Sequence, residues 1–202
     1  MRPLLILGCQ RSGTTLLASM LGRHSEVNML FESTSSDTLK LIGKKYQGNK
    51  LCTWRQIRMN ERSSRWGHIM NRIVNLGIPS DGYQIKRYAP TSKLSINDYL
   101  EKDAIIIVIR RDKAEIISSL MNRTPMNEKQ AKREFDLADS ILDEISEKAT
   151  EVNFKNLVND PEGQMRLLCP ILGIEFEEKM LEGPAYNIIY PQSGFDKKRA
   201  SS

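Results

Sequence analysis

The chain alternates short apolar runs with segments in which apolar residues recur at helical spacing. The runs that predict strands cover residues 4–7, 27–31, 82–88 and 104–110. Helical spacing follows the first run and returns over residues 129–149, where an apolar stripe predicts core packing. Strands that alternate with helices predict one α/β domain over the whole chain. We expect a three-layer, P-loop-like fold with a parallel sheet of about five strands flanked by helices.

The segment from Gly8 to Thr15 is a glycine-bounded loop rich in hydroxyl groups. Gly8 and Gly13 permit backbone angles that other residues resist, so the loop amides and the following helix N-terminus point at an anion. The GxxxxG spacing is that of nucleotide triphosphatases, but Thr14 stands where those proteins have lysine. Arg11 supplies a planar cation inside the loop instead. The loop predicts a phosphate cradle, with a generic strand-to-helix loop as the alternative.

The run over residues 104–110 is β-branched without interruption, which is typical of a strand buried on both faces. In a triphosphatase such a strand ends in an aspartate that holds magnesium. Here it ends in Arg110 and Arg111, which favours an anion site over a metal site. Glu32 follows the second strand, and ligands of open α/β sheets gather at the carboxyl ends of strands. We therefore expect Glu32 to face the Arg11 loop; a capping or surface carboxylate is the alternative.

Composition narrows the class of protein only in part. The 202 residues carry a net charge of +5, which suits a polyanionic ligand or nucleic acid equally. Three cysteines without a CxxC pair argue against a disulfide framework and a zinc site. We expect a cytoplasmic protein, because the chain shows no signal peptide and no apolar stretch that spans a bilayer; a trimmed Golgi enzyme is the alternative. Residues 196–202 are expected to form a flexible tail.

The loop sequence RSGTTL resembles the 5'-phosphosulfate loop of sulfotransferases that use 3'-phosphoadenosine 5'-phosphosulfate (PAPS). Its form is more similar to the tyrosylprotein and carbohydrate branch than to the cytosolic steroid and phenol branch. In that branch a glutamate at the distance of Glu32 serves as catalytic base, and a turn histidine matches His24, which we interpret as structural. The resemblance implies that the loop binds the 5'-phosphate through the residues Arg11, Ser12, Gly13, Thr14 and Thr15.

The same resemblance implies a second group of residues for the 3'-phosphate. The family has an arginine, a serine eight residues on, and in this branch an arginine four residues later. Arg111, Ser119 and Arg123 satisfy both spacings, whereas Arg110 with Ser118 satisfies only the first. Residues four apart share one helical face, so Ser119 and Arg123 can reach one phosphate. We prefer the first set, and the second stays open.

Three further site residues come from the resemblance alone. The family has a strand that ends in a lysine before a proline, and this lysine touches the sulfonate in flight. Lys86 is the match, with Arg87 as the fallback. Phe154 ends a fifth strand where the family often has tyrosine, and its ring is expected to pack on the nucleotide. Ser193 is a weak candidate in the loop that closes over the nucleotide.

Residues 33–80 match the variable region that shapes the acceptor pocket in the family. Alternating arginines and aromatics over residues 54–68 have two interpretations. One is contact with an acidic acceptor. The other, which we favour, is a solvated helix face with Trp54 and Trp66 turned inward.

The resemblance implies transfer of a sulfuryl group from PAPS to a hydroxyl group by in-line displacement without a metal. Glu32, Lys86 and Arg11 take the catalytic positions, and the acceptor is a tyrosyl, sugar or small alcohol or phenol. A glutamate and a phenol differ by about six pKa units, or roughly 8 kcal/mol. The proton must therefore move late, as the new bond forms, or burial must raise the pKa of Glu32.

Two other classes of function stay open. A P-loop-like kinase of a small molecule would share the loop, but the missing lysine and strand-end aspartate argue against it. A nucleic-acid-binding protein would use the basic surface, although no motif supports it. We expect a nucleotide donor and a hydroxyl acceptor as partners, with no nucleic acid and no membrane. The oligomeric state stays open, a homodimer included.

Overall fold

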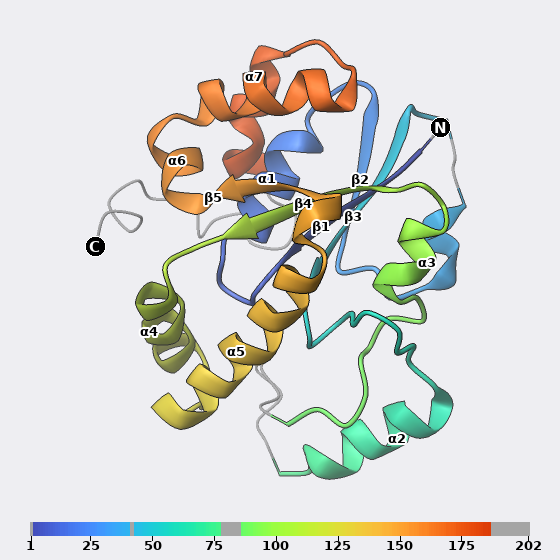
Figure 1. Cartoon of the computed structure of the whole chain (residues 1–202), viewed down its shortest axis with the longest axis vertical. Helices are drawn as coiled ribbons and strands as arrows, with labels where there is room; N and C mark the ends of the chain where they lie inside the picture. Colours follow the sequence, from blue (N-terminus) through green and yellow to red (C-terminus); the bar gives the residue numbers. More distant parts are fainter. Residues whose placement is uncertain (1, 41–42, 78–85, 187–202) are drawn as a thin grey trace.

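The computed structural model describes residues 2–40, 43–77 and 86–186. Its centre is a five-stranded sheet in the order β2-β3-β1-β4-β5, and every pairing is parallel (Figure 1). The strands are β1 (Arg2–Gly8), β2 (Val27–Phe31), β3 (Tyr46–Cys52), β4 (Ile105–Arg110) and β5 (Ala149–Asn153). The predicted fold class, an α/β domain with a parallel sheet of about five strands, is confirmed.

Helices connect the strands and cover both faces of the sheet. The α-helices are α1 (Thr14–Leu21), α2 (Arg65–Val74), α3 (Ile96–Leu100), α4 (Lys113–Arg123), α5 (Glu128–Glu144), α6 (Phe154–Asn159) and α7 (Pro161–Leu172). Three 3₁₀ segments complete the described elements: η1 (Ser36–Leu39), η2 (Ser146–Lys148) and η3 (Glu178–Tyr186). The helix predicted over 129–149 ends earlier, because the chain turns through η2 and enters β5. None of the described helices is both long and apolar enough to cross a bilayer.

β1 and β4 are buried on both faces, as their uninterrupted apolar runs predict. Leu4 and Ile6 of β1 pack on one face in a core shared with α1, α6 and α7. Leu5 and Leu7 pack on the opposite face with residues of α3 and α5. Successive side chains of a strand alternate between faces, so two helical layers enclose the sheet.

The strand predicted at residues 82–88 is wrong where the structure describes it. Residues 86–88 have no strand geometry, and 82–85 lie outside the described residues. The strand between β1 and β2 is instead β3, within the region 33–80. β3 is buried at every position although Gln47, Asn49 and Lys50 are polar. Each of these three side chains has a hydrogen-bond partner, which is why a strand without an apolar pattern can be buried.

Candidate functional site

The loop after β1 turns through two left-handed residues, Arg11 with φ 75° and Gly13 with φ 100°. A Cβ on Gly8 would lie 2.8 Å from the backbone oxygen of Ile109, and one on Gly13 would overlap the ring of Phe154. Glycine is therefore required at both positions. Left-handed turns of this kind gather backbone N–H groups into an anion-binding concavity at the start of α1. The left-handed backbone of Arg11 costs about 1–2 kcal/mol, a strain typical of functional sites.

The loop is in direct contact with the β4–α4 junction. The Nε of Arg11 donates a hydrogen bond to the Oγ of Ser119 at 3.1 Å. The Nη1 of Arg111 donates to the backbone oxygen of Arg11 at 3.3 Å. Two guanidinium groups and a serine hydroxyl from distant parts of the chain thus form one cluster beside the loop. Like charges held together in this way favour a multiply charged anion.

The structure gives different surroundings to Arg110, the last residue of β4, and to Arg111, which follows it. Arg110 forms ion pairs with Asp139, Asp143 and Glu151 at 2.6–2.9 Å, so carboxylates surround its guanidinium. Arg111 pairs only with the half-exposed Glu115 among the described carboxylates, and it lies against the loop. Consecutive strand residues point to opposite faces, which explains the difference. The geometry therefore favours Arg111 over Arg110 as the anion ligand.

The two serines of α4, Ser118 and Ser119, also have different surroundings. Ser119 contacts Arg11, whereas Ser118 is exposed and lies beside α5. Arg123, in the last turn of α4, is exposed. Its predicted role at the 3'-phosphate stays a prediction.

Glu32 directly follows β2 and has a left-handed backbone, with φ 55°. Its carboxylate forms an ion pair with Lys50 and accepts a hydrogen bond from the Nε2 of Gln56 at 2.8 Å. Burial raises the pKa of Glu32, but the charge of Lys50 and the hydrogen bonds from Lys50 and Gln56 outweigh it and hold the pKa below its ordinary value. Of the two routes for the acceptor proton, a base with a raised pKa is therefore not the one this structure supports.

The lysine beside Glu32 is Lys50 and not Lys86. The side chain of Lys50 is only 2% exposed and projects from the carboxyl-terminal part of β3. Lys86 is exposed, and its backbone N–H donates to Asn75 of the α2 C-terminus at 3.3 Å. Arg87, the fallback, is half-buried; burial first, and Arg55 second, lower its pKa to about 10. Sequence reasoning missed Lys50 because β3 has no apolar pattern.

Gln56 is a second residue that sequence reasoning missed. It follows β3 by four positions, and its Oε1 accepts the backbone N–H of Cys52 at 2.6 Å. This bond orients the amide so that its Nε2 faces Glu32. No sequence signal marks Gln56, because its partner Glu32 lies 24 residues earlier in the chain.

The remaining predicted residues lie in the loop and first turn of α1 or, in the case of Phe154, pack against them. Ser12 and Thr14 are buried and Thr15 is half-buried. Phe154, at 4% exposure, packs against Gly13, and the Arg111 guanidinium lies 4.4 Å from its ring centroid. In this position Phe154 supports the loop and Arg111, and its predicted packing on a nucleotide stays a prediction.

Two predicted features lie away from the loop. His24 is buried, and its Nε2 donates to the backbone oxygen of Glu175 at 2.7 Å while its Nδ1 accepts from Glu26, which fits a structural role. Ser193 lies outside the described residues.

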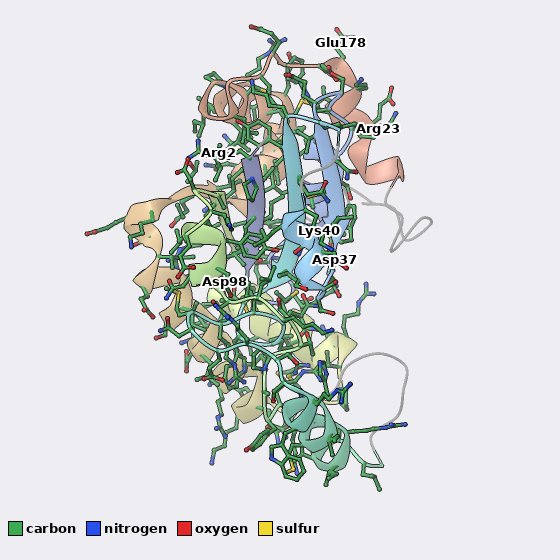
Figure 2. All side chains as sticks on the ribbon, turned by 90° about the vertical axis from the view of Figure 1, so that its right-hand side faces the viewer. Arg2, Arg23, Asp37, Lys40, Asp98 and Glu178 are labelled. Atoms are coloured by element: carbon green, nitrogen blue, oxygen red, sulfur yellow. The ribbon has the colours of Figure 1, made fainter. Side chains whose placement is uncertain are left out.

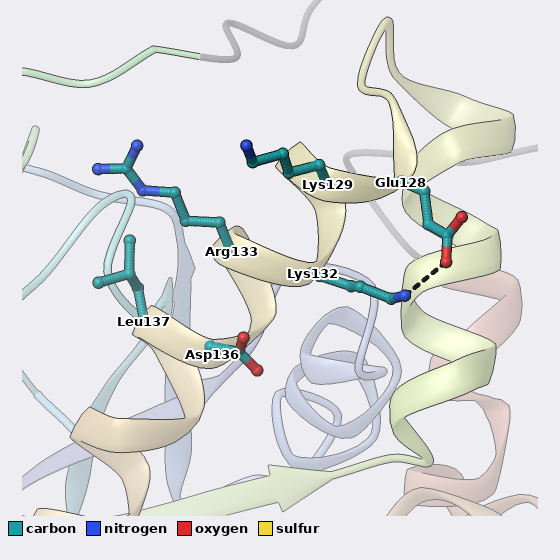
Figure 3. A pocket seen from close by; sticks show the side chains of 6 residues that line it. All are labelled: Glu128, Lys129, Lys132, Arg133, Asp136 and Leu137. Atoms are coloured by element: carbon teal, nitrogen blue, oxygen red, sulfur yellow. Dashed lines mark ion pairs between the residues drawn. The ribbon is translucent and has the colours of Figure 1, made fainter.

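A surface depression on α5 lies apart from this site (Figure 3). Its lining residues all belong to that helix: Glu128, Lys129, Lys132, Arg133, Asp136 and Leu137. It is a solvated helix face, on which Lys132 pairs with Glu128 and Asp136 pairs with Lys113 of α4. Elsewhere in the described ranges, no group of three or more His, Cys, Asp or Glu residues could hold a metal ion. A metal-free reaction stays a prediction.

The groups around the loop are hydrogen-bond donors and cations. Arg11, Arg111, Ser119 and the loop amides offer many N–H and O–H groups, and the buried Ser12 Oγ has no hydrogen-bond partner within the described part of the chain. This donor set fits a ligand with several phosphate or sulfate oxygens. The fold and the site define an α/β protein of the P-loop-like class, with a site rich in hydrogen-bond donors after its first strand.

The chain belongs to the sulfotransferase family, whose model matches residues 3–76 and 101–178. These ranges include Arg11, Glu32, Lys50, Arg111 and Ser119. The comparison with curated protein sequences found no match.

Solved sulfotransferase structures share the fold. The sulfotransferase domain of the Synechococcus PCC 7002 olefin synthase aligns with 98% of this chain and 82% of its own length, with a TM-score of 0.52 and 16% identity. Mouse sulfotransferase SULT7A1, solved in complex with PAP, aligns over 94% of this chain and 65% of its own, with a TM-score of 0.53 and 14% identity. Sulfotransferase STF9 from Mycobacterium avium aligns over 96% of this chain and 69% of its own, with a TM-score of 0.50 and 16% identity. At such identities the likeness concerns the fold.

Proposed function

We propose that this sulfotransferase moves a sulfuryl group from PAPS to a hydroxyl group of an acceptor. The observation that carries the proposal is the hydrogen bond between Arg11 and Ser119. It joins the phosphate-type loop to a second cluster of donors, as a nucleotide with a 5'- and a 3'-phosphate requires. The resemblance to the tyrosylprotein and carbohydrate branch makes a tyrosyl or sugar hydroxyl a candidate acceptor, beside small alcohols and phenols.

The chain offers distinct residues for each end of such a donor. The loop amides with Arg11, Thr14 and Thr15 would hold the 5'-phosphate, since they surround the helix N-terminus. Arg111 and Ser119, with Arg123 in the next turn, would hold the 3'-phosphate. PAPS itself supplies the sulfuryl group, and the 5'-phosphate is the leaving group.

Lys50 takes the role for which the sequence suggested Lys86. Its ammonium lies at the carboxyl end of a central strand, beside Glu32, where it can neutralise negative charge on the transferring oxygens. The family match includes Lys50, while Lys86 lies in the gap between the matched ranges. The same ammonium keeps Glu32 ionised. Glu32 is thus a carboxylate that accepts the acceptor's proton late, as the new sulfur–oxygen bond forms.

A screen of hydroxyl acceptors with sulfur-labelled PAPS, in the presence of a chelator, tests the proposal. We expect label in a hydroxyl acceptor and a loss of about 10²–10⁴-fold in turnover for Glu32→Gln. Binding of the desulfated nucleotide should persist in this variant. The control Glu26→Gln changes an exposed carboxyl just before β2 and should keep full activity.

Three results would contradict the proposal. Turnover of ATP with magnesium in place of sulfuryl transfer would indicate a kinase. Transfer that requires added magnesium would contradict the metal-free scheme. Loss of nucleotide binding in Glu32→Gln would make Glu32 a structural residue.

A further inference from the structure

Helix α2 packs on the protein through its small and polar residues. A Cβ on Gly67 would come within 2.6 Å of the Cβ of Ala89, so the helix lies close against this segment. The Oδ1 of Asn71 accepts the backbone N–H groups of Tyr88 and Ala89 at 2.6 and 2.9 Å. Its Nδ2 donates to the backbone oxygen of Ala89 at 2.8 Å. Gly67 and Asn71 are the buried residues of this helix.

The opposite face of α2 is apolar and exposed. Trp66 is 62% exposed, Ile69 49%, Ile73 53%, and Leu76, just beyond the helix, 80%. Their spacing of three and four residues places them on one face. The expectation that Trp66 turns inward is thus wrong, because glycine and asparagine occupy the inward face. The four side chains together expose on the order of 400 Å² of apolar surface, a patch size often functional in monomers.

Basic residues border this apolar face. From Arg62 to Gly77 the chain has three arginines and no aspartate or glutamate. Arg62 pairs with Asp98, whereas Arg65 and Arg72 are exposed and, within the described residues, form no ion pair. Each lies three or four positions from Ile69, so both flank the apolar side chains.

We infer that α2 is an interfacial helix that docks this end of the protein on an anionic lipid bilayer. An exposed apolar face with tryptophan, flanked by arginines, is suited to the boundary between acyl chains and headgroups. Arg65 and Arg72 would lie at the level of anionic headgroups. Figures 1 and 2 show α2 at one end of the molecule, away from α7 and Glu178.

A second copy of the chain fits the same face less well. A stable homodimer needs about 800 Å² from each partner, roughly twice what these side chains offer. A symmetric pairing through α2 would also bring the Arg65 and Arg72 side chains of both copies together, and like charges repel. Area and charge therefore both favour the lipid surface.

Vesicle flotation of the full chain tests the inference, with phosphatidylcholine alone and phosphatidylcholine mixed with phosphatidylserine. We expect flotation with the anionic vesicles only, weakened by salt, and a blue shift of tryptophan emission that Trp66→Phe abolishes. Arg65→Gln with Arg72→Gln should lower the partition coefficient about thirtyfold, at about fivefold for each charge.

Two double variants provide a matched comparison. Ile69→Ser with Ile73→Ser should abolish flotation, whereas Leu167→Ser with Ile171→Ser should not. Leu167 and Ile171 are also four positions apart and exposed, at 65% and 49%, but lie on α7. The inward face of α2 is unchanged in both, and thermal melts check that each variant folds.

Flotation is measured without donor or acceptor, so its result is independent of the proposed sulfuryl transfer. Absence of binding to anionic vesicles, or equal binding to neutral ones, would overturn the inference. So would a concentration-dependent dimer that Ile69→Ser with Ile73→Ser dissociates, because a second copy would then cover the face.

Discussion

The side-chain amide of Gln56 forms two hydrogen bonds, and these determine which of its atoms faces Glu32. Its oxygen accepts the N–H of Cys52, so its nitrogen donates to the Glu32 carboxylate. Gln56→Met removes a hydrogen bond that favours the ionised form. We expect the pKa of Glu32 to rise and the acid limb of the pH profile of kcat/KM to move to higher pH.

Gln47→Met is the matched control for this pH profile. Gln47 lies within β3, and its side-chain partner is Asn28 and not Glu32. The control should keep the acid limb of the wild type. An unchanged acid limb in Gln56→Met would show that Gln56 does not position Glu32.

Replacing Lys50 and replacing Lys86 should have different effects on kcat, because only Lys50 lies beside Glu32. Lys50→Met should lower kcat by about 10²–10³-fold, because a cation held close to developing charge is lost. Lys86→Met should leave kcat within a few-fold, because Lys86 is exposed. Steady-state kinetics at saturating donor measure both. The reverse order of effects would restore Lys86 to the site.

The loop between β1 and α1 depends on a backbone that only glycine adopts without strain. Gly13→Ala adds the left-handed cost of about 1–2 kcal/mol and a collision with Phe154 worth about 1–3 kcal/mol more. Gly77→Ala has a similar φ, 81°, but its Cβ would meet no described atom within 4 Å. Urea denaturation should therefore show a larger loss for Gly13→Ala. Equal losses would mean that Phe154 does not support the loop.

The segment after β3 is tied to α5 by a buried ion pair. Arg55 and Glu134 are 4% and 8% exposed, and they contact each other directly. Glu134→Gln removes the buried negative charge that the Arg55 guanidinium contacts and should lower the free energy of unfolding by about 3–5 kcal/mol. Glu128→Gln, which breaks an exposed pair on the same helix, should cause no measurable loss. Similar losses would contradict the role of the buried pair.

At the scale of the whole molecule, stability should fall in acid. Burial alone would raise the pKa of Glu177. Hydrogen bonds from Ser25 and Lys179 outweigh this effect and lower the pKa from 4.5 to about 2. The unfolded state therefore binds a proton at higher pH than the folded state. This contribution is complete above about pH 4.5 and is lost as pH falls toward 2.

Glu177→Gln should flatten the dependence of the unfolding free energy on pH in this window, as measured by urea denaturation at several pH values. The neighbouring change Glu175→Gln should keep the wild-type curve. A steep curve in Glu177→Gln would assign the acid sensitivity to other carboxyl groups.

The sequence predicts most of the sheet and half of the site. β1, β2 and β4 are apolar runs, so their pattern predicts them. β3 is different, because its polar residues are satisfied by partners distant in the chain, such as Asn49 with Tyr99 and Lys50 with Glu32. Motif spacing suffices for Arg11 and Ser119, which the structure brings into contact, but it says nothing about Lys50.

Calorimetric titration of the full chain without added metal tests the central claim, that the loop and the Arg111 cluster bind the two ends of one bisphosphorylated nucleotide. We predict tighter binding of adenosine 3',5'-bisphosphate than of adenosine 5'-monophosphate. Arg111→Ala should reduce this preference by at least about tenfold, while Lys113→Ala, two positions further on at the start of α4, should keep it. Equal affinity for the two nucleotides, or an unchanged preference in Arg111→Ala, would contradict the claim.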